Sequence, residues 1–176
     1  MATSRVPLQL TNTIQKRTAE VDAYIEANGL PEPSFNPSYP PTLHLSPEAD
    51  TARNAALEAL EELRAHLLGP IGMVMDHLGE MSRLVSLHGL THFKIPAALP
   101  ADGTLTKITE LAAKTGMHSN DTKTLVRHAS SRRFLGHLPG DLVSYSAASK
   151  AILAIPALSE VLSCASSISK SLNSVV

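Results

Sequence analysis

The chain has 176 residues and a mass of 18.7 kDa, which is the size of one ordinary domain or of a small domain with an arm. Hydrophobic residues make up 43% and charged residues 18%, with a formal net charge of -1. This composition argues against a highly charged disordered chain and against a generally basic nucleic-acid-binding protein. A single cysteine, Cys164, excludes an internal disulfide framework and a thiolate metal cluster.

The first expected element is a helix over residues 11–28. Apolar residues recur there at helical spacing: Leu10, Ile14, Val21 and Ile25. The N-terminal residues contain no apolar core of signal-peptide length, and no apolar run along the chain is long enough for a spanning helix. We therefore expect a cytoplasmic protein that does not enter a membrane.

A proline-rich segment follows this helix. Six of the twelve prolines lie between Pro31 and Pro47, where they remove backbone donors and fix φ. Neither a helix nor an inner strand can persist through such a segment. The sequence therefore predicts an N-terminal helix or arm over 1–29, an extended linker over 30–47 and a domain over 48–176.

A second helix is predicted to begin at Ser46, since a serine cap, a proline in the first turn and an early acid favour a helix start. One face of this helix is apolar: Ala49, Ala52, Ala56, Leu60, Leu63 and Leu67. Such a stripe needs a partner, either within the fold or in a second chain. The Gly69-Pro70 pair is expected to interrupt the helix, and two further helical pieces are expected to follow, the last ending near His88.

In the second half of the chain, glycines and prolines separate the segments in the order expected of a helix-turn-helix with a wing. One helix is predicted to be capped within residues 104–106, to carry Ile108, Leu111 and Ala112 on its inner face and to end at Gly116. A second helix is predicted to begin at residue 119 or 120. Two short apolar runs around a Pro139-Gly140 turn predict a β-hairpin. A helix from Ala147 to Ala154 follows, and the serine-rich tail 158–176 is weakly helical. The expected fold class is mainly α, a winged helix-turn-helix with a small hairpin and extra N-terminal helices.

Four segments of this half carry a resemblance to a known family. They are Phe93–Pro96 (FKIP), Leu105–Gly116 (LTKITELAAKTG), Leu125–Ala129 (LVRHA) and Tyr145–Ser149 (YSAAS). In this order and spacing they resemble the N-terminal winged-helix dimerisation domain of plant and fungal class I O-methyltransferases, most of all the fungal group that methylates aromatic polyketides. The match covers roughly residues 45–170.

The resemblance also implies a second domain, whose sequence motif does not occur here. Full-length members continue into a Rossmann-like domain that holds S-adenosylmethionine and a catalytic histidine. Here the sequence reaches Val176 near the expected hand-over, and no glycine-rich strand-turn-helix occurs in it. We therefore expect no cofactor and no methyl transfer by this chain alone. Because helices of the family's dimerisation domain interlock between chains, the resemblance implies a homodimer, or a heterodimer with a methyltransferase.

Candidate chemistry is limited to a few side chains. His88 and His92 have the four-residue spacing of metal ligands on a helix, but a third ligand and an acid between them are missing, so no metal site is expected. His128 lies on the helix that the resemblance places near the substrate cavity. With His88, His92 and Tyr145 it is a candidate for lining a pocket that binds an aromatic polyketide. Structural hydrogen bonding is the alternative for all four residues, and their catalytic role stays open.

The helix after residue 119 is basic. Lys123, Arg127, Arg132 and Arg133 stand against the single acid Asp121. In a winged-helix regulator it would be the recognition helix. DNA affinity rests on many phosphate contacts, and the wing and the preceding helix offer few cations, so nucleic acid is an improbable partner.

Three hypotheses of function remain at this point. The first is a stand-alone O-methyltransferase-like dimerisation domain of fungal secondary metabolism, an accessory or binding subunit without methyl transfer. The second is a cofactor-independent cyclase, dehydratase or decarboxylase acting on a polyketide-like substrate. The third is a winged-helix DNA-binding regulator.

Overall fold

The computed structural model describes residues 5–100, 102–155 and 157. Within them the chain forms two compact units. Among the described residues, unit 1 comprises the chain up to Pro33 and Thr42–Leu78, and unit 2 comprises Ser34–Pro41 and the chain from Gly79 onwards. Most of the regular structure is helical, which confirms the expectation of a mainly α fold. No helix among the described residues is both long and apolar enough to span a bilayer.

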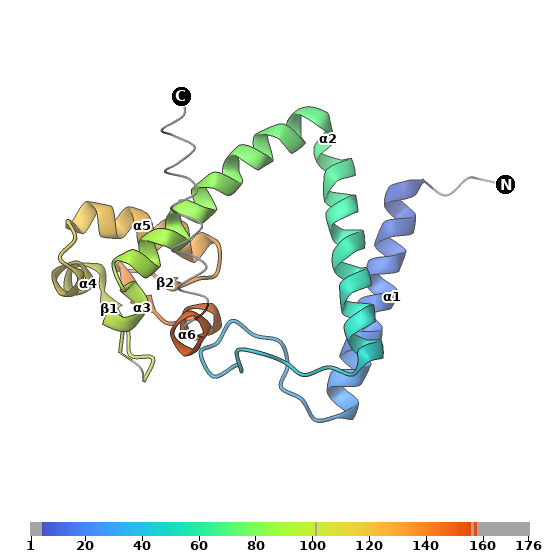
Figure 1. The fold of residues 1–176 in the computed structure, drawn as a ribbon, viewed down its shortest axis with the longest axis horizontal. Helices are drawn as coiled ribbons and strands as arrows, with labels where there is room; N and C mark the ends of the chain where they lie inside the picture. The colour runs from blue at the N-terminus through green and yellow to red at the C-terminus, as the bar shows by residue number, and fades with distance from the viewer. Residues whose placement is uncertain (1–4, 101, 156, 158–176) are drawn as a thin grey trace. The chain divides into compact units, whose positions relative to one another are not determined.

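Unit 1 is built from α1 (Val6–Ala27) and the first part of α2 (Pro47–His92) (Figure 1). The predicted first helix is confirmed, but it begins five residues earlier than expected because Pro7 is well suited to a first turn. The predicted start of α2 is also correct: the Ser46 hydroxyl accepts a hydrogen bond from the Ala49 amide at 3.2 Å.

A kink interrupts α2 at the predicted place. Gly69 has φ 66° and ψ 174°, a backbone conformation outside the helical region, and Pro70 follows it (Figure 1). Beyond the kink, however, the two further helical pieces expected from the sequence are one continuous helix up to His92. No proline lies between residues 71 and 92 to break it, and isolated glycines inside a helix cost only about 1 kcal/mol each.

Unit 2 contains the second half of the predicted elements. After the C-terminal part of α2 come α3 (Ile95–Ala98), β1 (Thr106–Lys107), α4 (Ile108–Thr115), α5 (Ser119–Ser131), β2 (Gly136–Leu138), β3 (Leu142–Ser144) and α6 (Ala147–Ala154). Two helices followed by a hairpin occur in the order expected from the sequence. The short β1 was not predicted; it pairs antiparallel with β3, so the sheet order is β1-β3-β2.

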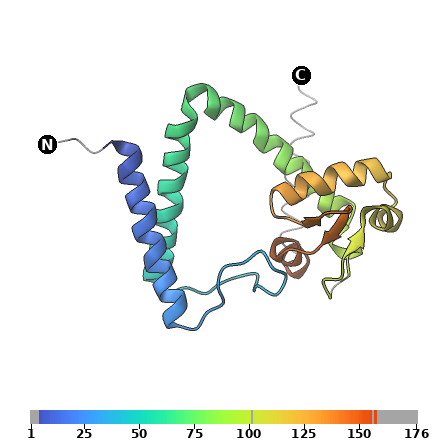
Figure 2. The same ribbon diagram turned by 180° about the vertical axis from the view of Figure 1, so that it is seen from behind.

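The core of unit 2 gathers side chains from nearly all of these elements. Buried apolar residues cluster around the sheet and the helix pair: Leu90, Ile95, Leu99, Ile108, Leu111, Val126, Ala129, Leu135, Val143 and Tyr145. Figure 2 shows the hairpin next to α5, which contacts β2. The helix α6 begins with a capping box in which Ser146 and Ser149 bond each other's backbone amides.

The compact units differ from the boundaries drawn on the sequence. The expected limits at 29/30 and 47/48 fall near the end of α1 and at the start of α2. Within the proline-rich linker, however, residues Ser34–Pro41 group with unit 2. We call this segment the strap. The weakly helical tail expected over 158–176, with Cys164, lies outside the described residues.

Candidate functional site: a cavity beside Tyr145

The strap contacts the rest of unit 2 at three points. The carbonyl oxygen of Phe35 accepts a hydrogen bond from the Ala147 amide at 2.9 Å, at the start of α6. One turn later, the Lys150 ammonium group donates to the Pro37 carbonyl oxygen at 3.0 Å. The Arg133 guanidinium carbon lies 5.4 Å from the centre of the Phe35 ring, within the range of a cation–π contact. Although its prolines predict an extended segment, the strap is not extended throughout, because it turns at residues 36–39, where the Tyr39 amide donates to the Asn36 carbonyl oxygen at 2.9 Å. The carbonyl oxygens of Phe35 and Pro37 stay available to accept hydrogen bonds from α6.

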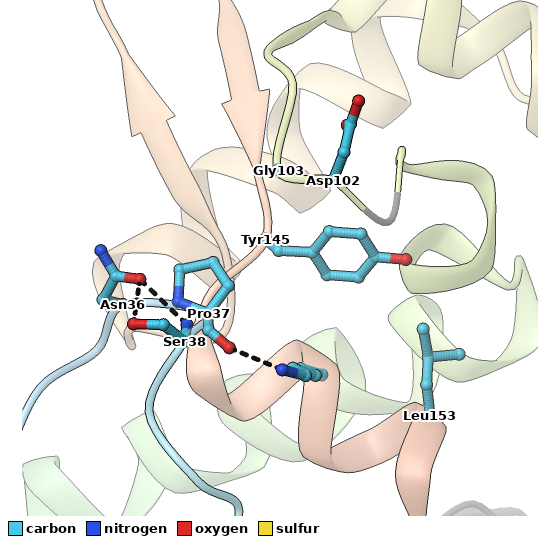
Figure 3. A pocket seen from close by; sticks show the side chains of 8 residues that line it. Asn36, Pro37, Ser38, Asp102, Gly103, Tyr145 and Leu153 are labelled. Carbon is cyan, nitrogen blue, oxygen red and sulfur yellow. Dashed lines mark hydrogen bonds between the residues drawn. The ribbon is translucent and has the colours of Figure 1, made fainter. Parts of the chain in front are cut away.

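A cavity of about 540 Å³ lies between the strap and the rest of unit 2 (Figure 3). Asn36, Pro37 and Ser38 line it from the strap, and Tyr145, Lys150 and Leu153 line it from β3 onwards. Asp102 and Gly103 complete the lining from the loop before β1. The volume falls in the range of small-molecule sites in proteins, about 300–1,000 Å³.

Tyr145 contributes its ring to this cavity and turns its hydroxyl group elsewhere. The residue is 8% exposed, and its hydroxyl group donates to the carbonyl oxygens of Pro96 and, at 3.2 Å, of Leu99. Burial raises the pKa of the Tyr145 phenol above its ordinary value. The hydroxyl is therefore occupied in joining the chain after β3 to α3, and the aromatic ring is what a ligand would meet.

Two charged groups border the same cavity. The Asp102 carboxylate accepts a hydrogen bond from the Thr104 amide at 2.9 Å, and this bond lowers the pKa of Asp102. The second charged group is the Lys150 ammonium group.

Lys150 was not singled out in the sequence, because one lysine in the first turn after a serine cap carries no functional signal. The strap was also missed as part of a site: its prolines predict an extended segment but not where that segment docks.

The candidate histidines lie elsewhere in unit 2. The rings of His88 and His92 are 5.5 Å apart between centroids, and the His92 ring meets Phe93 edge-on at 4.8 Å. The His88 Nδ1 atom is buried and has no hydrogen-bond partner among the described residues. No group of three metal-ligating side chains is found in the part of the chain that the structure describes.

His128 is hydrogen-bonded to the buried hydroxyl group of Ser86, which joins α5 to the C-terminal part of α2. One turn along both helices, a Cβ atom on Gly89 would lie 3.0 Å from a methyl group of Leu125. The two helices therefore pack closely at small residues. None of the three candidate histidines is among the residues that line the Tyr145 cavity, so the structure pairs His88 with His92, and His128 with Ser86, apart from Tyr145.

The described residues do not suit S-adenosylmethionine. The nucleotide-type cradle of a Rossmann-like domain needs a parallel strand, a glycine-rich turn and a helix. The strands described here have two or three residues and pair antiparallel. We therefore derive no methyl-transfer step from these residues.

The basic side chains of α5 are largely engaged within unit 2. The Lys123 ammonium group lies 2.5 Å from an Asp141 carboxylate oxygen, and an Arg127 nitrogen lies 3.9 Å from the other. Asp141 lies in the turn of the hairpin, so its carboxylate offsets part of the positive charge of the helix that would face DNA in a regulator. Arg133, which follows α5, lies over the Phe35 ring of the strap.

Comparison with known proteins identifies relatives of this chain. No protein-family model matches the chain. PaMT, an O-methyltransferase of Phomopsis amygdali, is 35% identical over 143 residues, which cover 81% of this chain and 33% of PaMT. The chain is therefore similar, over most of its own length, to part of a fungal O-methyltransferase. The match to PaMT confirms the expected resemblance of this chain to the N-terminal domain of such enzymes.

Further matches agree with this family. The O-methyltransferase of the grayanic acid biosynthesis cluster of Cladonia grayi is 29% identical over 147 residues, which cover 83% of this chain and 30% of that protein. In fold, the O-methyltransferase-like chain matches the crystal structure of OxaC in complex with SAH and oxaline with a TM-score of 0.56 at 20% identity, over 82% of this chain and 33% of OxaC. The chain spans about a third of the length of these relatives.

One relative has a name of another kind. The transcriptional coactivator AacuS of Aspergillus aculeatus is 33% identical over 112 residues, which cover 63% of the O-methyltransferase-like chain and 26% of AacuS. The same sequence pattern therefore occurs in proteins named as enzymes and in one named as a regulator.

Proposed function

We propose that this chain is a cytoplasmic accessory or binding subunit of fungal secondary-metabolite biosynthesis. It uses the N-terminal domain of an O-methyltransferase and does not itself transfer methyl groups. It associates with a second copy of itself or with a methyltransferase. Residues 48–176 are the O-methyltransferase-like domain of this proposal, with the helix of 1–29 as an arm and 30–47 as the linker.

The observation that carries the proposal is the apolar surface of unit 1. Exposed large apolar residues gather around the kink of α2: Leu67, Leu68, Ile71, Met73, Val74 and Met75. Ile71 is 81% exposed and Leu67 74%. Soluble monomers seldom expose such a contiguous apolar run, and an exposed apolar run of this kind marks an interaction site.

The core of unit 1 supports the same conclusion. Its buried apolar residues, among those described, are Ile25, Ala49, Ala52 and Ala59. Three alanines and one isoleucine bury little surface, since hydrophobic stabilisation scales with the apolar area removed from water. The predicted stripe is thus partly confirmed, because Ala49 and Ala52 are buried, whereas Leu60 and Leu67 are exposed. A second chain that covers the leucines would supply the missing burial.

A regulatory role is the second candidate, and the relation to AacuS favours it. The pairing of Lys123 and Arg127 with Asp141 speaks for regulation through protein contacts rather than through DNA. The cofactor-independent enzyme has less support, since Tyr145 and the candidate histidines do not line one cavity.

Calorimetric titration with S-adenosylmethionine tests the central negative statement of the proposal, with full-length PaMT as the positive control. We expect heat of binding for PaMT and none for this chain. Saturable binding to this chain would overturn the proposal.

A duplex-binding assay at physiological salt separates the two regulatory candidates. Retention of DNA by this chain would favour a DNA-binding regulator.

A further inference from the structure

Part of the lining of the cavity beside Tyr145 is apolar. The Tyr145 ring, the Pro37 ring and the Leu153 side chain line it (Figure 3). Tyr145 is held rigidly, because its hydroxyl group bonds two carbonyl oxygens of the chain around α3. Aromatic rings prefer to stack in an offset arrangement on other rings, so a flat aromatic body suits this lining.

One ammonium group borders that surface. Lys150 carries three donors, and among the described residues its single hydrogen bond goes to the Pro37 carbonyl oxygen. Lys150 therefore has donors left for an anion in the cavity. A charge-assisted bond from an ammonium group to a carboxylate is stronger than a bond between neutral groups.

The one carboxylate of the lining does not compensate this cation. Asp102 is bound to the Thr104 amide, and Figure 3 shows its carboxylate directed away from the Tyr145 ring. Lys150 is bonded to the strap and has no ion pair with a described residue. Lys150 is therefore the one cation of the lining, and its ammonium group is not paired with the carboxylate of Asp102.

We propose that this cavity binds a small aromatic carboxylate, whose ring lies against Tyr145 and Pro37 and whose carboxylate accepts hydrogen bonds from Lys150. The inference rests on the proposed binding role and names the ligand class and its site. Because the strap forms one wall, the bound ligand also holds the strap on α6. Such a ligand stabilises the fastened strap by mass action.

The test uses 2-naphthoate and its neutral isostere 2-naphthamide, titrated calorimetrically into the full chain. We expect saturable binding of 2-naphthoate and weaker binding of 2-naphthamide. Lys150→Met keeps the apolar stem and removes the charge, and we expect it to weaken 2-naphthoate binding about fivefold to tenfold. Leu153→Asp places a negative charge on the wall at an exposed position, and we expect it to abolish binding.

Lys114→Met is the matched control. Lys114 is also an exposed helix lysine whose ammonium group donates to a backbone carbonyl, that of Ala98 at 3.4 Å, but it does not line this cavity. The affinity of the Lys114→Met variant for 2-naphthoate should equal that of the wild type. A second readout is hydrogen exchange at the Ala147 amide, which bonds the strap and should exchange more slowly with 2-naphthoate bound.

Equal binding of the acid and the amide, or unchanged affinity in Lys150→Met, would overturn the site. The absence of saturable binding of 2-naphthoate would overturn it as well. These outcomes are distinguishable from a failure of the proposed function, since association through unit 1 and the response to S-adenosylmethionine do not depend on Lys150.

Discussion

Arg64 and Asp76 form a bidentate ion pair across the kink of α2. In a straight helix, residues twelve apart lie about 18 Å from each other along the axis. The pair can form only because the chain turns at Gly69, whose φ of 66° and ψ of 174° is a conformation essentially restricted to glycine. The turn of the chain at Gly69-Pro70 is therefore what allows the ion pair between Arg64 and Asp76.

Asp76→Asn should therefore lower the free energy of unfolding of unit 1. We expect a loss of about 1 kcal/mol, since the pair is bidentate but partly solvated, with side chains 41% and 21% exposed. Asp50→Asn is the matched control, because Asp50 pairs with Arg53 at 2.6 Å within straight helix and both side chains are more exposed. Urea denaturation followed by circular dichroism measures both variants. Equal losses would show that the kink-spanning pair adds nothing special.

Close packing of α2 on α5 depends on Gly89. A Cβ atom there would lie 3.0 and 3.2 Å from the two methyl groups of Leu125. We expect Gly89→Ala to destabilise unit 2 by about 1 kcal/mol, because the crowding outweighs the gain in helix propensity. A Cβ on Gly79 meets nothing within 4 Å, so Gly79→Ala should be neutral or stabilising by up to about 1 kcal/mol. Thermal melts of the two variants compare them, and a stabilised Gly89→Ala would contradict the packing described.

The hydrogen bond between His128 and Ser86 predicts a structural role for His128. Its removal in His128→Ala leaves the buried Ser86 hydroxyl group without this partner, at a cost of about 1 kcal/mol in the free energy of unfolding. His92 is exposed, so His92→Ala should change stability by less than about 0.5 kcal/mol. Turnover of a polyketide that His128→Ala abolishes while leaving the fold intact would instead favour the cofactor-independent enzyme.

Tyr145→Phe tests the hydroxyl group that joins the end of β3 to α3. At neutral pH we expect a loss of about 1–2 kcal/mol, because the carbonyl oxygens of Pro96 and Leu99 lose their donor. Burial raises the pKa of Tyr145 above 10.0, so the phenol ionises more readily in the unfolded chain. The contribution of the Tyr145 hydroxyl group to stability is complete below about pH 10 and is lost as the pH rises through the folded-state pKa of Tyr145. The stability gap between wild type and variant should therefore narrow above about pH 10, and a widening gap would contradict the assignment.

Local signals in the sequence were enough for most of the fold. The serine cap at Ser46, the Gly69-Pro70 break, the Pro139-Gly140 turn and the start of α6 each act within a few residues, and the structure confirms them. The strand β1 has two residues and exists through its pairing with β3, a contact that no local pattern encodes.

The site was much less predictable. Tyr145 was singled out and does line the cavity, but Lys150 and the strap were missed. Their role arises from two segments more than a hundred residues apart, joined by the bond from Lys150 to Pro37. The family resemblance made a shared pocket of Tyr145 and the histidines a candidate, with structural hydrogen bonds as the alternative. Side-chain direction on each element decides which of these residues meet.

Sedimentation equilibrium of the purified chain at micromolar concentrations tests most directly whether the apolar surface around Ile71 is an association surface. The account predicts a species of twice the 18.7 kDa chain mass, or a heterodimer once a partner methyltransferase is added, and dissociation in Ile71→Glu. A folded monomer at every concentration, alone and with the methyltransferase, would contradict it.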